Sequence, residues 1–195
     1  MSQIIKFIDN ISLIDKTDFD NLTANISSPF INYDFLSSLE VSKCVSKSTG
    51  WESNHLTSYK KNKLDGFMPL YTKNNSQGEF VFDHSWSYAL NRAGRNYYPK
   101  LLTAIPFTPC ESKKIIGNEV NKFFFEEVVE YMHKKNIESW HVLFPDNDLG
   151  NDLKENNFIE RNGYKFIWKN KNYSSFDEYL GMFKSRQRKN IRSER

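Results

Sequence analysis

The clearest pattern of hydrophobic and polar positions lies at residues 119–135. Apolar side chains recur there at steps of four and fall on one face of a helix: Val120, Phe124, Val128 and Met132. We therefore predict an amphipathic helix over 119–135. Similar reasoning predicts shorter helices at 15–26, 29–45, 85–93 and 148–156. A capping box, Ser175-x-x-Glu178, predicts a last helix that continues into the basic residues at the end of the sequence.

Short apolar or alternating runs predict the strands. They lie at 4–8, 56–59, 66–71, 139–144 and 164–168, with further extended segments at 79–83 and within 97–105. The runs 56–59 and 66–71 are separated by four polar residues, which predicts an antiparallel pair. A hairpin followed by strand–helix–strand–helix–strand predicts a mixed α/β (α+β) fold and argues against an all-helical or sandwich protein.

Composition narrows the class of protein. The 195 residues include 16 Phe, 10 Tyr and 4 Trp, which argues against disorder. No apolar run approaches about 18 residues, so we expect no membrane span. The first residues lack the pattern of a signal peptide, and Cys44 and Cys110 match no disulfide or metal spacing. We therefore expect a cytoplasmic protein without a metal site.

The positive charge is concentrated at one end of the sequence. Six cations and one anion fall within 184–195, whereas the whole chain carries only +3, so the remainder is slightly acidic. On a helix, Lys184, Arg188 and Arg192 would follow one another on one face. Such a segment suits a phosphorylated or otherwise anionic substrate, but a solvated helix end and a non-specific RNA contact are alternatives.

Several blocks together resemble a known bacterial family. They are Gly78-Glu79-Phe80-Val81-Phe82-Asp83 with Trp86, Tyr97-Tyr98-Pro99-Lys100-Leu101, Ile105-Pro106-Phe107-Thr108-Pro109, His141-Val142-Leu143-Phe144-Pro145, and Arg186-x-Arg188-Lys189. From about Phe30 onward, their order is similar to the predicted N-acyltransferases labelled peptidoglycan biosynthesis/recognition, relatives of the GNAT superfamily and of Fem-type aminoacyltransferases.

The resemblance implies a GNAT-like fold, with a mixed, mostly antiparallel sheet flanked by helices. Because family members are about twice as long, it also implies an N-terminal half. We expect a half-domain at 1–183 and a basic helix end at 184–195 that leads to a second GNAT-like half. The implied activity is N-acyl transfer: an acyl or aminoacyl group passes to an amine of a small molecule or of a cell-envelope precursor related to peptidoglycan.

The implied acyl donor is acetyl-CoA or another acyl carrier, with aminoacyl-tRNA as the alternative and as the only nucleic acid expected. Two features depart from the relatives. Ser112 and Lys114 stand where the family usually has Gly and Arg, and Lys cannot form a bidentate fork. The pyrophosphate loop Q/R-x-x-G-x-G/A is missing from the sequence. The donor site is therefore absent, degenerate or located in the other half.

Acyl transfer to an amine needs a base, a donor for the oxyanion and a groove that aligns the substrates. Glu79 and Asp83 have even spacing on an extended run and would face the same side, so they are the catalytic candidates. The alternative is structural: Asp83 would cap the following helix, and Glu79 would face solvent.

The resemblance also implies the substrate-binding candidates, which are Trp86, Tyr97, Tyr98, Lys100, Phe107, Thr108, His141, Arg186, Arg188 and Lys189. Each has an ordinary structural alternative: a surface lysine at Lys100, a rigid loop at Phe107 and Thr108, and a core histidine at His141. Two other functions remain open for the chain. It could be a catalytically silent recognition or scaffolding half, or an RNA-contacting module that acts through its basic end.

Overall fold

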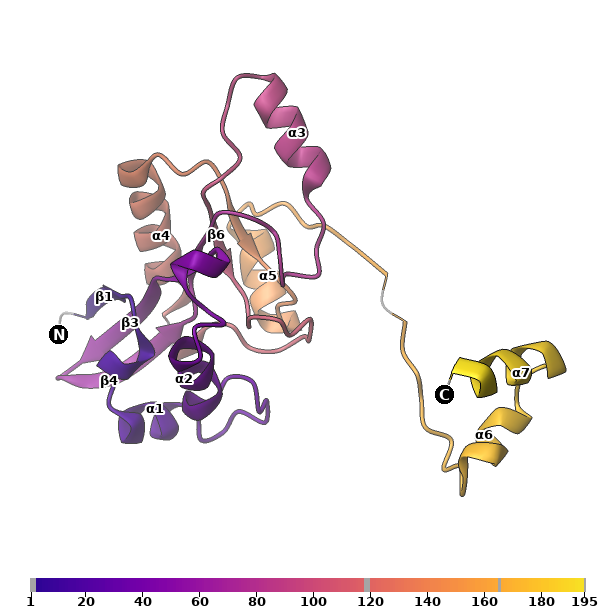
Figure 1. The fold of residues 1–195 in the computed structure, drawn as a ribbon. Coiled ribbons are helices and arrows are strands. Elements are labelled where there is room, and N and C mark those ends of the chain that lie inside the picture. Colours follow the sequence, from indigo (N-terminus) through magenta and orange to yellow (C-terminus); the bar gives the residue numbers. More distant parts are fainter. Residues whose placement is uncertain (1–2, 118–119, 165, 195) are drawn as a thin grey trace. The chain divides into compact units, whose positions relative to one another are not determined.

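Two four-stranded sheets form the centre of the larger of two units in the computed structural model, which describes residues 3–117, 120–164 and 166–194 (Figure 1). The first sheet has the order β1-β3-β4-β7 and is antiparallel. Its strands are β1 (Ile4–Ile8), β3 (His55–Lys60), β4 (Lys63–Met68) and β7 (Ile116–Gly117). Lys61 and Asn62 connect β3 to β4 with positive φ angles, as a tight hairpin requires.

The second sheet has the order β2-β5-β6-β8. Its strands are β2 (Trp51–Ser53), β5 (Tyr71–Lys73), β6 (Lys100–Thr103) and β8 (Trp140–Val142). The pairs β2–β5 and β5–β6 are antiparallel, whereas β6 and β8 run parallel. The fold is therefore mixed α/β with mostly antiparallel sheets flanked by helices, which confirms the predicted fold class.

The helices of the larger unit begin at side-chain caps in several cases. They are η1 (Ile11–Leu13), α1 (Lys16–Thr23), α2 (Tyr33–Val41), η2 (Lys47–Thr49), α3 (His84–Arg92), α4 (Asn121–Lys135) and α5 (Asn147–Glu155). Asp15, Asn32 and Asp146 accept hydrogen bonds from the first-turn N–H groups of α1, α2 and α5.

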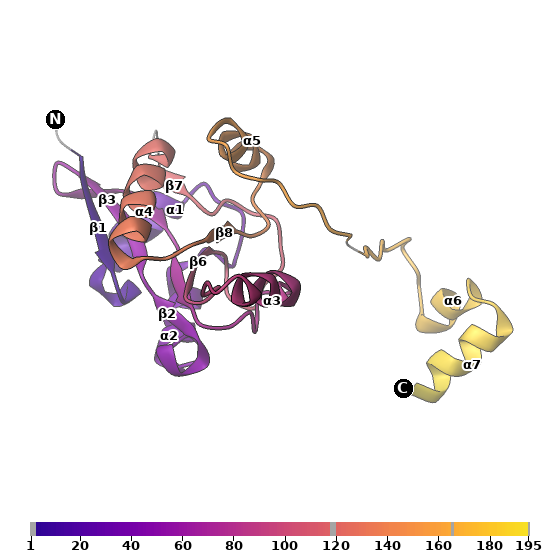
Figure 2. The same ribbon diagram turned by 90° about the horizontal axis from the view of Figure 1, so that it is seen from above.

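Helices cover both faces of the first sheet, as neighbouring residues of β4 show. Met68 belongs to a core cluster with Phe124 and Val128 of α4, whereas Phe67 packs with Phe19 of α1 and Leu36 of α2. Because successive strand residues point to opposite faces, α4 lies on one face and α1 and α2 lie on the other (Figures 1 and 2). Helix α3 stands away from the sheets and has no buried residue.

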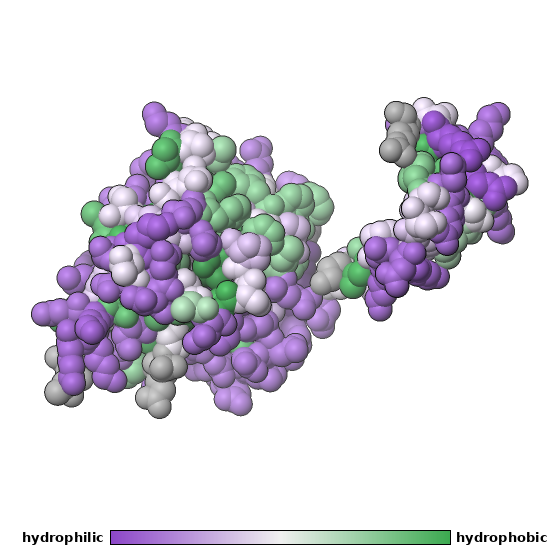
Figure 3. All heavy atoms as spheres, turned by 90° about the horizontal axis from the view of Figure 1, so that it is seen from below, coloured by the Kyte–Doolittle hydropathy of each residue, from purple (hydrophilic) through white to green (hydrophobic). Residues whose placement is uncertain are grey.

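The smaller unit, Ile159–Arg195, contains α6 (Phe176–Gly181) and α7 (Ser185–Glu194). Ser175 caps α6 by accepting a hydrogen bond from the backbone N–H of Glu178, as the capping box predicts. Figure 3 shows hydrophilic side chains over much of this unit. In the described part of the chain, no helix is both long and apolar enough to cross a membrane.

Four sequence expectations need correction. The last helix is divided into α6 and α7 rather than continuous, and α2 begins at its Asn32 cap instead of near 29. The run 79–83 is not a strand, because a turn ends there and Phe80 has a φ of 59°. No strand forms at 164 and 166–168. Residue 165 lies outside the described residues, as do 118 and 119, and 119 is the first residue of the predicted long helix.

Candidate active site

Four buried charged residues meet where β5 and β6 pair. Lys73 ends β5, Lys100 begins β6, and the two lie directly opposite each other in the sheet. Glu79 and Asp83 come from the segment between these strands. All four are 3% exposed or less. Two like charges facing each other across a strand pair destabilise the sheet, so the carboxylates are needed to balance the lysines.

Lys100 joins the two carboxylates. Its Nζ donates to Glu79 Oε2 at 2.7 Å and also to Asp83 Oδ2. Tyr97 donates its hydroxyl to Asp83 Oδ2 at 2.8 Å, and Tyr98 donates to Asp83 Oδ1 at 3.2 Å. Asp83 therefore accepts side-chain hydrogen bonds from Lys100, Tyr97 and Tyr98, and Ser76 is a further partner, whereas Glu79 accepts one from Lys100.

These contacts overturn the structural alternatives for both carboxylates and for the lysine. Asp83 occupies the N-cap position of α3, but its side chain makes no capping hydrogen bond. Glu79 is buried rather than facing solvent, and Lys100 is not a surface lysine. Glu79 and Asp83 do converge, as expected, but through a turn and not along a strand.

The second oxygen of Glu79 differs from the first. Oε1 is buried and has no hydrogen-bond partner among the described residues, although Lys73 Nζ lies 4.0 Å away. Lys73 instead donates to the backbone oxygen of Gln77 at 3.1 Å and lies 3.7 Å from the centre of the Trp51 ring. A buried carboxylate oxygen without a donor is costly and marks a place where a further group can bind.

The environment separates the acidities of the two carboxyl groups. Burial alone would raise the pKa of Asp83, but the hydrogen bond and charge of Lys100, together with the Tyr97 hydroxyl, lower it to about 2. At Glu79, burial outweighs the attraction of Lys100 and Lys73 and raises the pKa. Asp83 thus stays ionised at neutral pH, and Glu79 is the stronger proton acceptor of the two.

The other titratable groups are affected by the same burial. It lowers the pKa of Lys73 to about 8, against the opposing attraction of Glu79. It also raises the pKa of Tyr98 to about 12 and, with the hydrogen bond to Asp83, raises that of Tyr97. Both tyrosines are therefore hydroxyl donors at neutral pH rather than phenolates.

The turn before Glu79 is shaped by close packing. Gly78 has a φ of 77°, and a Cβ there would lie 2.5 Å from the Phe107 ring. Phe107 also packs on Trp51, with 5.4 Å between the ring centres. Phe107, a substrate-binding candidate, thus supports the turn that carries Glu79. Thr108 donates its hydroxyl to the backbone oxygen of Pro106.

The remaining candidates are divided between the two units. His141, on β8, is half-buried, and its Nε2 lies 3.2 Å from the Tyr97 hydroxyl. Trp86 is exposed on α3. Arg186, Arg188 and Lys189 lie on α7 of the smaller unit, where Arg188 donates to the hydroxyl of Ser185. The structure therefore gathers Glu79, Asp83, Tyr97, Tyr98, Lys100 and His141 into one cluster of the larger unit.

Sequence reasoning missed two sets of buried polar residues besides Lys73. Glu40 accepts hydrogen bonds from Ser53 Oγ at 2.7 Å, from His55 Nε2 at 2.9 Å and from the backbone N–H of Ile11 at 2.9 Å. Burial would raise the pKa of Glu40, but the hydrogen bond and charge of His55 lower it. Since both carboxylate oxygens have partners, this cluster is suited to joining α2, β2 and β3.

Lys114 forms the other set. Its completely buried ammonium donates to the backbone oxygens of Cys110, Ser112 and Phe144 and to the hydroxyl of Ser112. Burial lowers the pKa of Lys114 to about 8. The sequence had pointed to this position only because Lys114 stands where the family usually has Arg. The contacts show a lysine that ties its own loop together.

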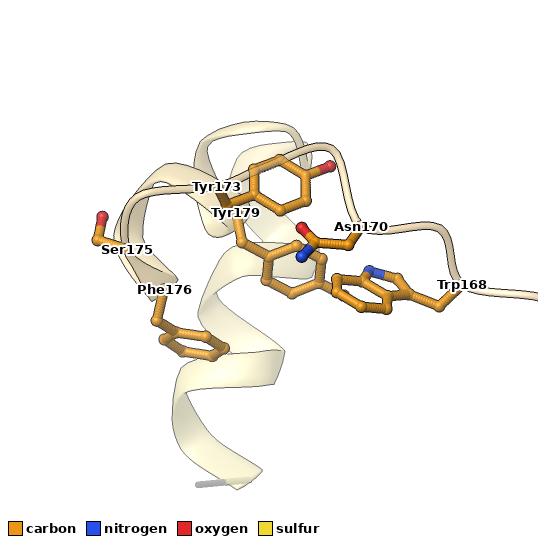
Figure 4. Close-up of a pocket in the computed structure, with 6 residues that line it drawn as sticks. All are labelled: Trp168, Asn170, Tyr173, Ser175, Phe176 and Tyr179. Carbon is orange, nitrogen blue, oxygen red and sulfur yellow. The ribbon is translucent and has the colours of Figure 1, made fainter.

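A pocket of about 500 Å³ lies in the smaller unit and contains none of these charges. Its lining is mostly aromatic, with Trp168, Tyr173, Phe176 and Tyr179 beside Asn170 and Ser175 (Figure 4). The Tyr173 and Tyr179 ring centres are 5.4 Å apart. The described residues hold no group of three or more His, Cys, Asp or Glu side chains able to bind a metal ion.

Two solved N-acetyltransferase structures are similar to this structure. The ribosomal-protein-alanine N-acetyltransferase of Brucella melitensis biovar Abortus 2308 matches with a TM-score of 0.50 and 10% identity, over 87% of this chain and 99% of that one. The aminoglycoside 6'-N-acetyltransferase AAC(6')-IG of Acinetobacter haemolyticus matches with a TM-score of 0.47 and 12% identity, over 86% of this chain and 98% of that one.

At such low identity the Brucella structure establishes the fold alone. No curated protein matches the chain in sequence. A family model does match, over residues 10–195, and its description is FemAB-like, peptidoglycan biosynthesis/recognition. This span includes the second sheet, the first sheet apart from β1, the buried cluster and the basic helix, in agreement with the resemblance seen in the sequence. The chain belongs to the FemAB-like family of peptidoglycan biosynthesis and recognition proteins.

Proposed function

We propose that this chain is an N-acyltransferase that transfers an acyl group to an amine of a peptidoglycan-related substrate, with Glu79 as the general base. The family and the N-acetyltransferase fold support the reaction class. One observation carries the assignment of the base. Glu79 is a buried carboxylate with a raised pKa and one oxygen that accepts no hydrogen bond from the described residues.

The proposed step needs one proton transfer and one displacement. The amine nitrogen attacks the acyl carbonyl carbon and forms the new C–N bond, and its proton passes to Glu79 Oε1. The bond from the acyl carbon to the donor then breaks, and the leaving group keeps the electron pair. A base whose pKa is raised toward the working pH accelerates such a step by about 10²- to 10⁴-fold.

The neighbours of Glu79 hold it in place. Lys100 binds Oε2, and Asp83, fixed by Tyr97 and Tyr98, holds Lys100. These residues position the base and need not touch the substrate. Tyr98 and His141 are half-buried at the edge of the cluster, so an amine would approach from their side. Trp86 is exposed on the helix that follows Asp83, and Phe107 and Thr108 complete the candidates in this unit.

The donor in this proposal is an acyl-CoA, with aminoacyl-tRNA as the second possibility. On α7, the charged candidates are Arg186, Arg188 and Lys189, and we assign them to an anionic part of a ligand. Binding that weakens steeply with salt and does not depend on Glu79 would instead favour RNA contact by α7.

The test is acyl transfer from acetyl-CoA to a muropeptide that has a free amine, with the product detected by mass spectrometry. Thiol reagents are unsuitable for following the released CoA, because Cys44 and Cys110 are both exposed. Glu79→Gln should lower the rate by about 100-fold or more, whereas Glu126→Gln, at an exposed position of α4, should not change it.

A folded Glu79→Gln variant with the wild-type rate would refute the assignment of the base. If the wild-type chain binds the muropeptide but transfers no acyl group from acetyl-CoA or aminoacyl-tRNA, it acts as a recognition half. Calorimetry with acetyl-CoA separates a missing donor site from a missing base.

A further inference from the structure

Lys73 has no role in the step above, although it is completely buried beside the proposed base. Its position is well determined by its surroundings. The ammonium donates to the backbone oxygen of Gln77 and lies over the Trp51 ring, and Trp51 Nε1 donates to the same Gln77 oxygen at 3.0 Å. The backbone oxygen of Gln77 thus holds both the Lys73 ammonium and the Trp51 ring in place.

The distance from Lys73 to Glu79 is the informative quantity. At 4.0 Å, Nζ is too far from Oε1 for a hydrogen bond but close enough for a strong effect of its charge in a buried site. Lys100, in contrast, makes a hydrogen bond of 2.7 Å to Oε2. The two lysines therefore act differently on the two oxygens of one carboxylate.

A hydrogen bond from Lys73 would occupy Oε1 and oppose its protonation. Without Lys73, Glu79 would have a single cation shared with Asp83, and the proton affinity of its carboxyl group would rise further. At 4.0 Å from Oε1, the Lys73 ammonium favours the ionised carboxylate by its charge and donates no hydrogen bond to Oε1. The lone pairs of Oε1 therefore stay available to accept a proton.

We propose that Lys73 is a positioning residue for the base: its ammonium, fixed by Trp51 and Gln77 4.0 Å from Glu79 Oε1, favours the ionised carboxylate and leaves that oxygen open to the amine proton. This inference rests on the proposed function. The proton moves from the amine nitrogen to Oε1, Oε2 keeps its bond to Lys100, and Lys73 keeps its own proton throughout.

The experiment is a titration of Glu79 without any substrate. The chain is labelled with 13C at the glutamate carboxyl groups, and the Glu79 signal is assigned by its loss in Glu79→Gln. In Lys73→Met, which keeps an unbranched side chain over Trp51 but removes the charge, the midpoint of Glu79 should move to higher pH by about one pH unit, a tenfold gain in proton affinity. Lys63→Met, at an exposed position of β4, should leave it unchanged.

The reciprocal titration covers the case in which Lys73→Met does not fold. With 13C-labelled lysine, the Lys73 midpoint should move to lower pH in Glu79→Gln, because the coupling between two sites is the same from either side. Unchanged midpoints in these titrations would overturn the inference, since an ammonium that favours the ionised form of Glu79 must move them.

Failure of this inference and failure of the proposed function give different results. If Glu79→Gln abolishes acyl transfer but the titration midpoint of Glu79 is the same in wild type and in Lys73→Met, only the proposed role of Lys73 is wrong. If the midpoints move as stated but Glu79→Gln remains fully active, the charge coupling is real and the proposed base is wrong. In an active enzyme, Lys73→Met should also shift the acidic limb of the pH–rate profile upward.

Discussion

Replacing Lys100 with Met removes the ammonium that binds both buried carboxylates. The unbranched side chain is kept, so the main change is the loss of charge and of two hydrogen bonds. Glu79 and Asp83 are each 3% exposed or less, so solvent cannot substitute for the lost donor. Removing one partner of a buried ion pair costs about 3–5 kcal/mol. We expect Lys100→Met to lose about that much free energy of unfolding at pH 7.

The pKa of Asp83 gives an independent measure. Its lowering from 3.8 to about 2 corresponds to about 2 kcal/mol of stability at neutral pH. This stability is present above the unfolded pKa and is lost as the pH falls toward 2. Glu79, which loses its hydrogen bond in the same variant, accounts for the rest of the expected loss.

The pH dependence of the variant should have the opposite sign. Without Lys100, both carboxyl groups bind protons more tightly in the folded chain than in the unfolded chain. Such groups stabilise the fold below their unfolded pKa, and that contribution disappears as the pH rises through the folded pKa. The difference in stability between wild type and Lys100→Met should therefore be much smaller at pH 4 than at pH 7.

The assay is urea unfolding at both pH values, followed by tryptophan fluorescence. A Trp168→Phe background confines the signal to the larger unit, which contains the other three tryptophans. Equal slopes against urea are needed before the free energies are compared. Lys113→Met, an exposed change in a nearby loop, is the control. A loss under about 1 kcal/mol at pH 7, or an equal loss at pH 4, would refute the reasoning.

Three further predictions concern the stability of the same unit and can be measured by urea unfolding. Glu40→Gln should cost about 2 kcal/mol, because the charge is lost and an NH2 group replaces one of the two oxygens that accept the three hydrogen bonds, and no change would contradict this role. Gly78→Ala should lower the free energy of unfolding by about 1 kcal/mol more than Gly94→Ala. Both glycines have a positive φ, but only at Gly78 would the new Cβ clash with the Phe107 ring. Asp83→Asn should abolish the loss of about 2 kcal/mol that wild type shows between about pH 5 and pH 2, and a preserved acid transition would contradict the pKa assignment.

The sequence predicted those elements whose pattern is local. Helix α4 was predicted over 119–135 and is observed at Asn121–Lys135, and β1 was predicted at 4–8 and is observed at Ile4–Ile8. Periodicity and capping residues determine such elements without help from distant segments. The strand predicted at 164–168 has an apolar pattern too, but a strand also needs a neighbour, which a pattern does not supply.

The turn that carries Glu79 was not predictable in the same way. The run 79–83 alternates as a strand would, yet Phe80 takes a φ of 59°. A positive φ is rare for a bulky residue, and here Phe107 and Trp51 pack around the preceding Gly78. Contacts with residues far along the chain therefore decide the backbone at this point.

The candidate site was predicted in part for a related reason. Glu79, Asp83, Lys100 and the two tyrosines were singled out by their sequence neighbourhood, which the resemblance to the family supplied. Lys73 was missed as a site residue, since its relation to Lys100 depends on the register between β5 and β6. That register pairs Lys73 with Lys100, which are 27 positions apart in the sequence, and a local sequence pattern cannot predict such a pairing.

The two carboxylates of the cluster share one lysine and are both almost inaccessible to solvent, and yet their pKa values move in opposite directions. The difference follows from the deeper burial of Glu79 and from the larger number of donors at Asp83. Among the described residues, Asp83 has donors in Lys100, both tyrosines and Ser76, whereas Glu79 accepts from Lys100 alone. A fold that needed only stability would be served as well by apolar side chains at these positions. An unequal distribution of donors between two buried acids has a different consequence: it keeps one of them ionised and makes the other able to take a proton.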